Sequence, residues 1–92
     1  MDITKVLTIS TAHITEETDR KLQDESELNN MCISVYDKAE YGYWIYIDPY
    51  DRLTNIPVDL LNCTKLARQN GCRWLCLDCD GEIVPKLPTY DW

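Results

Sequence analysis

Residues 41–47, with the sequence YGYWIYI, predict a β-strand in which both faces are apolar. Side chains alternate along a strand, so Ile45 and Ile47 share one face while Trp44 and Tyr46 share the other. A sheet built around this strand can bury its isoleucine face beneath helices. Its aromatic face then also needs a cover, because a large apolar surface is rarely left in water.

Three further segments alternate in the same way and predict strands over residues 5–11, 31–37 and 73–78. Residues 38–40 are a plausible turn between the second and third strands. We expect helices over residues 16–28, where Thr15 is a good N-cap, and over residues 57–70, where Pro57 suits the first turn. Glycine at 71 favours the end of the second helix.

This β-α-β-β-α-β order is typical of the ferredoxin-like α+β sandwich, with a four-stranded antiparallel sheet and two helices on one face. We expect one domain over residues 1–92. The helix-facing side chains would be Leu7, Ile9, Ile33, Val35, Ile45, Ile47, Leu75 and Leu77. The opposite face would carry Val6, Thr8, Tyr36, Trp44, Tyr46, Trp74 and Cys76. We expect the Pro-rich tail over residues 85–92 to pack on this face; the alternative cover is a partner.

Acidic residues outnumber basic ones by 16 to 9, which gives a net charge of −7. Direct binding to nucleic acid or to an anionic membrane needs a concentrated positive surface, so we expect neither. The sequence lacks an apolar run long enough for a membrane span and does not open with an export signal. Together with an odd number of cysteines, five, this predicts reduced thiols and a cytoplasmic protein.

Three patterns could carry chemistry, and each has a simpler structural interpretation. The run from Leu75 to Gly81, LCLDCDG, resembles the first motif of haloacid-dehalogenase-type phosphotransferases, but we expect a strand closed by an Asp-Gly turn. Cys76 and Cys79 would point to opposite faces of a strand, and a second C-x-x-C is missing, so we expect buried thiols and not a metal or redox site. His13 precedes a helix and suits a turn or cap. We therefore predict no catalytic residues, no metal and no cofactor.

The first predicted helix is strongly acidic. Its carboxylates would lie on adjacent turns, about 5–6 Å apart, close to the phosphate spacing along one DNA strand. Such a row is either a solvated helix face or a docking surface that attracts a basic partner. Aromatic side chains from the sheet would then supply the desolvated anchors. The candidate partner-binding residues are Glu16, Glu17, Asp19, Asp24, Glu25, Glu27, Trp44 and Tyr46.

Three stretches resemble a small uncharacterised protein family of bacterial mobile elements, namely phages, plasmids and integrative elements. They are residues 6–18 (VLTISTAHITEET), 42–47 (GYWIYI) and 72–92 (CRWLCLDCDGEIVPKLPTYDW). The resemblance brings no catalytic residues. It implies a function that is common in such elements, which often encode small acidic proteins that block host defence, including DNA-mimicking anti-CRISPR and anti-restriction proteins.

Two functions follow as hypotheses. In the first, the protein is a non-enzymatic inhibitor in the bacterial cytoplasm that docks on a basic nucleic-acid-binding protein, such as a CRISPR effector or a restriction enzyme. In the second, it is a self-associating accessory or regulatory protein of mobile-element maintenance, with a homodimer formed through edge strands or the open sheet face.

Overall fold

The computed structural model describes residues 1, 3–39, 41–48 and 54–92. Its sheet contains four strands: β1 (Val6–Ser10), β2 (Val35–Asp37), β3 (Gly42–Tyr46) and β4 (Trp74–Asp78). Three α-helices accompany them, α1 (Glu16–Leu22), α2 (Glu25–Met31) and α3 (Val58–Gln69), with a short 3₁₀ helix, η1 (Thr11–His13), after β1. The mixed α+β class and the four-stranded sheet are therefore as predicted.

The order of the strands differs from the expected one. It is β1-β4-β3-β2, with β1 and β4 parallel and the other two pairs antiparallel, so the prediction of an all-antiparallel ferredoxin-like sheet is wrong. Burial explains which strand takes the centre. Leu75, Cys76 and Leu77 of β4 are all buried, as expected for a strand with a neighbour on each side, whereas Val6 of β1 is 41% exposed at the edge.

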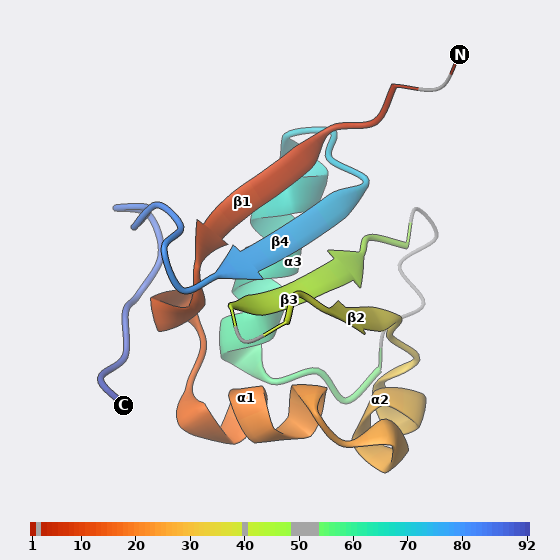
Figure 1. The fold of residues 1–92 in the computed structure, drawn as a ribbon, viewed down its shortest axis with the longest axis vertical. Helices are drawn as coiled ribbons and strands as arrows, with labels where there is room; N and C mark the ends of the chain where they lie inside the picture. Colours follow the sequence, from red (N-terminus) through yellow and green to blue (C-terminus); the bar gives the residue numbers. More distant parts are fainter. Residues whose placement is uncertain (2, 40, 49–53) are drawn as a thin grey trace.

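The expected helix over residues 16–28 is two helices joined at an angle (Figure 1). Asp24 causes the break, because its side chain accepts a hydrogen bond of 2.9 Å from the Ser26 N–H and so begins a new helix. The second helix, α2, runs past residue 28, where the predicted helix ended. Met31 is 1% exposed in the core, and its burial outweighs the weak helix propensity of the two asparagines. The expected strand over 31–37 is correspondingly reduced to β2.

The core lies between α3 and one face of the sheet, which Figure 1 shows with α3 behind the strands. Leu60, Cys63 and Ala67 of α3, predicted to share a face, are all at most 1% exposed. The helix-facing side chains of the strands are paired across the sheet as predicted, for example Leu7 with Leu75 and Ile45 with Leu75. The two short helices lie beside the β2–β3 hairpin and not over the middle of the sheet (Figure 1).

Two glycines make close backbone contacts possible. A Cβ atom on Gly42, which has φ +151°, would lie 1.7 Å from the carbonyl oxygen of Leu77 in β4. A Cβ atom on Gly81 would lie 2.5 Å from the backbone of Ile9, where Glu82 pairs with the edge of β1. At the predicted turn, the Lys38 N–H donates to the Gly42 carbonyl at 2.9 Å; Glu40 lies outside the described residues.

Candidate interaction surfaces

The outer face of the sheet is an aromatic surface. The register places Tyr36 beside Trp44, Trp44 beside Cys76, and Tyr46 beside Trp74, so the predicted set of side chains does share this face. The rings of Tyr46 and Trp74 meet edge to face with centroids 5.4 Å apart, and Tyr36 lies 5.9 Å from Trp74. We call these four rings, Tyr36, Trp44, Tyr46 and Trp74, the aromatic face.

One ion pair borders the aromatic face. Lys38, just after β2, bonds to the carboxylate of Asp78 at the end of β4, and its ammonium lies 5.6 Å from the centre of the Trp44 ring. The hydrogen bond to Asp78 raises the pKa of Lys38, and the same bond lowers the pKa of Asp78. Both groups are therefore charged at neutral pH, and their charges offset each other at this border.

The C-terminal segment leaves the aromatic face uncovered. It runs down beside η1 (Figure 1), where the Tyr90 N–H donates to the Ala12 carbonyl at 2.9 Å and the Trp92 indole N–H donates to the Ile14 carbonyl at 2.8 Å. Residues 86–88 lie against α3. The expected packing of residues 85–92 over the aromatic face is thus not observed. The backbone groups of η1 and the β1 edge provide hydrogen bonds that a surface of rings cannot.

His13 attaches this segment to the rest of the molecule. Its ring is 1% exposed, with Nδ1 2.8 Å from the Pro88 carbonyl oxygen and Nε2 2.9 Å from the Val84 N–H. Since a carbonyl can only accept and an N–H can only donate, Nδ1 carries the proton and Nε2 accepts. His13 is therefore a structural residue, but its role differs from the turn or cap predicted: its partners lie about 70 residues further along the chain, and Thr15 caps α1.

A second surface is a groove of about 850 Å³ between the α1–α2 pair and the β2–β3 hairpin. Its floor includes Tyr43, which is 6% exposed and donates a hydrogen bond of 2.6 Å to the Asp19 carboxylate. Gln23 donates to both, at 2.9 Å to the Tyr43 oxygen and 3.1 Å to Asp19. Burial, with the bond to Asp19, raises the pKa of Tyr43 to about 12. Glu25 and Asp37 also line the groove. We call it the acidic groove.

The predicted partner-binding residues do not form one surface. Trp44 and Tyr46 belong to the aromatic face, and all six acids lie on the α1–α2 pair or at its joint. Asp19 is bonded to Tyr43, and Asp24 caps α2, so these two have structural tasks. Glu16, Glu17 and Glu25 are exposed, with Glu17 4.0 Å from Lys21. The bend between the helices interrupts the continuous carboxylate row that one long helix would present.

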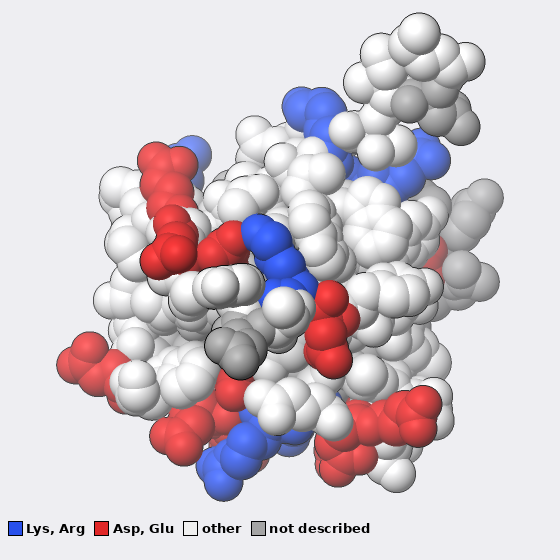
Figure 2. Space-filling model, in the orientation of Figure 1, with Lys and Arg blue, Asp and Glu red and all other residues white. Residues whose placement is uncertain are grey.

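Figure 2 looks directly onto the aromatic face. Uncharged atoms cover much of the area over the sheet. Carboxylates lie along the lower rim, over α1 and α2, with basic side chains between them, and a second group lies at the upper left, over the segment after β4. Side chains of both charges also lie near the middle of the view. The aromatic face and the acidic rim are therefore visible from one side. A single partner could contact both.

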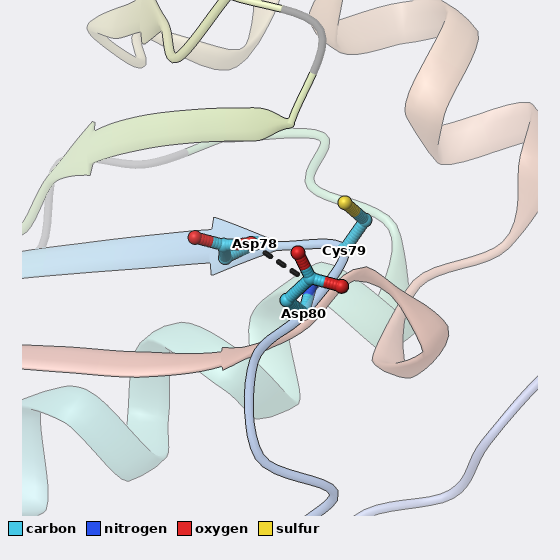
Figure 3. A group of neighbouring side chains, drawn as sticks. All are labelled: Asp78, Cys79 and Asp80. Atoms are coloured by element: carbon cyan, nitrogen blue, oxygen red, sulfur yellow. Dashed lines mark hydrogen bonds between the residues drawn. The ribbon is translucent and has the colours of Figure 1, made fainter.

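The Asp78–Cys79–Asp80 group forms the predicted turn after β4 (Figure 3). The ligand atoms of the three side chains lie within 4.8 Å of one another, and Cys79 and Asp80 are exposed. The Asp78 carboxylate is already engaged: it accepts from the Asp80 N–H at 2.9 Å and from Lys38. The Gly81 N–H donates to the Asp78 carbonyl at 2.9 Å and completes the turn. These contacts account for the D-x-D-G pattern as a strand end.

The two thiols of the C-x-x-C pattern lie in different environments. Cys76 is 1% exposed on the aromatic-face side of β4, and burial raises the pKa of its thiol. Cys79 is exposed at the acidic groove. All five cysteines are free. The structure therefore gives Cys76 the packing role expected of a buried thiol. The same expectation is wrong for Cys79, because the chain turns after Asp78 and leaves its thiol exposed.

Comparison with known proteins identifies the family. Residues 6–92 match the model described as "Family of unknown function (DUF5983) C-terminal domain", and the chain belongs to this family. No curated protein and no solved structure matches it significantly. Among the described residues, no helix is long and apolar enough to cross a bilayer.

Proposed function

We propose that this domain is a non-enzymatic binding protein that docks on another protein through its aromatic face. The observation that carries the proposal is the set of four rings on the sheet, which no segment among residues 3–39, 41–48 and 54–92 covers. Tyr36 is 59% exposed, and Trp44, Tyr46 and Trp74 are half-buried, although the domain has a C-terminal segment that could have covered them. Trp and Tyr are the side chains most often found at the energetic centres of protein interfaces.

The charge of the molecule supports a basic partner. The net charge of −7 and the carboxylates along the rim would attract a positive surface from a distance, and the rings would then desolvate against it. The Lys38–Asp78 pair adds no net charge to the border of this interface. We infer that electrostatic attraction sets the association rate and that the aromatic face sets the lifetime of the complex.

The partner class that we propose is a nucleic-acid-binding protein of bacterial defence, either a CRISPR effector or a restriction enzyme. Such proteins carry the basic grooves that an acidic domain can occupy. The resemblance of residues 6–18, 42–47 and 72–92 to proteins of mobile elements motivates this choice. The domain would then act in the bacterial cytoplasm, where its five free thiols would remain reduced.

Purified CRISPR effectors and restriction enzymes provide the test, with capture of each protein and inhibition of its DNA cleavage as readouts. Two variants test the two parts of the surface separately: Tyr36→Ala with Trp44→Ala removes two of the four rings, and Glu16→Lys with Glu17→Lys reverses charge on the rim. Asp19 and Asp24 stay unchanged because their carboxylates accept hydrogen bonds from Tyr43 and from the Ser26 N–H, which stabilise the fold. Val58→Ala is the control, since Val58 is 71% exposed on α3, which lies behind the sheet.

We expect the ring variant to lose capture, the charge variant to bind more slowly with weaker salt dependence, and Val58→Ala to behave as wild type. Capture that survives both sets of substitutions would show that neither surface is the interface. If none of the defence proteins is captured, the proposed partner class is wrong.

The second candidate function is self-association, in an accessory or regulatory role. An uncovered apolar face can pair with its own copy about a two-fold axis, and the short edge strand β2 lies next to it. Light scattering over a range of concentrations tests this candidate. A dimer that the Tyr36→Ala, Trp44→Ala variant dissociates would favour it over docking on a foreign protein, whereas a monomer at every concentration would exclude it.

A further inference from the structure

We propose that the acidic groove binds an arginine side chain presented by the partner protein. This inference rests on the proposed function, because it names the chemistry of one contact made by the same partner. It concerns a different surface from the aromatic face, so the two can be tested separately.

The charge of the groove is one-sided. Asp19, Glu25 and Asp37 line it, and among the described residues no lysine, arginine or histidine does. The nearby Lys38 is held away by its bond to Asp78 at the border of the aromatic face. A cation entering the groove would therefore meet three carboxylates without repulsion from its lining. An anion would be repelled by the same three carboxylates.

Exposed rings in the groove favour arginine over lysine. Tyr41 is 54% exposed and Trp92 is 52% exposed, and both line the groove. A guanidinium is planar, stacks on aromatic rings and is more weakly hydrated than an ammonium, so it gains more from such a site. Its fork of N–H donors also matches carboxylates in a two-bond geometry.

Hydrogen bonds hold two of the side chains that line the groove. The Asp19 carboxylate is held by the Tyr43 hydroxyl and by Gln23, which fix its position. Trp92 is held by its bond to the Ile14 carbonyl. A preformed site of this kind loses little side-chain freedom on binding, which favours affinity. By contrast, Glu25 and Asp37 are exposed and can be substituted without disturbing these contacts.

The test uses short capped peptides and the full chain. One peptide contains two arginines between glycines, a second has lysines in their place, and a third has citrullines, which keep the shape without the charge. Binding is followed by NMR at the Trp92 indole and the Gly42 amide. We expect the arginine peptide to bind most tightly, the lysine peptide several-fold more weakly, and the citrulline peptide not measurably.

Two matched variants separate the groove from the overall charge. Glu25→Gln with Asp37→Asn removes two charges from the groove, whereas Asp80→Asn with Glu82→Gln removes two exposed charges from the turn after β4, outside the groove. We expect a loss of about tenfold in arginine-peptide affinity for the first variant and less than twofold for the second. Equal losses, equal binding of lysine and arginine peptides, or no binding by the wild type would overturn the inference.

Failure of this inference is distinguishable from failure of the proposed function. If the groove variant captures a defence protein as the wild type does, while Tyr36→Ala with Trp44→Ala does not, the aromatic face is the interface and the groove is not part of it. If arginine peptides bind the groove but no defence protein is captured, the groove binds cations and the proposed partner class is wrong.

Discussion

The hydroxyl of Tyr43 donates a hydrogen bond of 2.6 Å to the carboxylate of Asp19, and this bond joins β3 to α1 across the floor of the acidic groove. Tyr43 has the same strand parity as Ile45, so its ring enters the core while its oxygen reaches the groove. The contact connects the stability of the domain with the shape of its groove.

Tyr43→Phe should lower the free energy of unfolding by about 1–3 kcal/mol at pH 7, because it removes a hydrogen bond to a charged group. The pKa of Tyr43 is about 12 in the folded chain and about 10 when unfolded. The unfolded state therefore ionises first, and the advantage of wild type over Tyr43→Phe should shrink as the pH rises from 10 towards 12. Urea denaturation of both proteins at pH 7, 10 and 11.5 measures this difference. A constant difference across that range would contradict the assignment.

His13→Ala should release the C-terminal segment as well as destabilise the core. It removes the bonds to Val84 and Pro88 and leaves a cavity at a buried position, with an expected cost of about 2–4 kcal/mol. Trypsin cleavage after Lys86 gives a direct readout of release. Trp92→Phe, which removes only the indole bond to Ile14, is the milder control and should remain more resistant than His13→Ala.

Thiol labelling should divide the five cysteines into two groups. Cys32 and Cys79 are exposed and should react within minutes with an alkylating reagent at pH 8. Cys63, Cys72 and Cys76 are buried, and burial raises the pKa of Cys63 to about 12, so these three should react only when the domain opens. Mass spectrometry of the labelled native protein counts the modified sites. A third fast site at Cys76 would show that the aromatic face opens readily.

Gly42→Ala should be among the most damaging single substitutions in the domain. The added methyl group would overlap the Leu77 carbonyl, so β3 would have to separate locally from β4, at a cost above about 3 kcal/mol. Gly71→Ala is the matched control: Gly71 also has positive φ, but the nearest atom to its added Cβ is the Lys5 ammonium nitrogen at 3.9 Å. Thermal unfolding should show a much larger loss for Gly42→Ala. Equal losses would mean that backbone strain alone, and not the overlap, explains the effect.

The alternation of side chains predicted which residues share each face of the sheet, because that pattern depends only on neighbouring positions. Trp44 and Trp74 lie together for this reason. The strand order was not predictable in the same way, since β1 has the same alternation whether it pairs with β3 or with β4. The burial of both faces of β4 was a usable signal: the run WLCL is apolar without interruption, as a central strand requires.

The acidic groove and the role of His13 depend on contacts between distant parts of the chain. Asp19 and Tyr43 come from different elements, and His13 binds residues near the C-terminus. Sequence patterns identified the acids of residues 16–28 but could not show that Asp24 would divide them between two helices. The capping preference of aspartate was the available signal, and it competed with a helical pattern that continued on both sides.

The parallel pairing of Val6 with Trp74 has a consequence for biosynthesis. Within this domain β1 is synthesised first and β4 last, and β1 pairs only with β4 in the sheet. The sheet is therefore completed only when almost all of the domain has emerged from the ribosome. Until then β1 lacks the neighbouring strand that pairs with its backbone, and a nascent chain of this kind would depend on late, long-range pairing for its protection from aggregation.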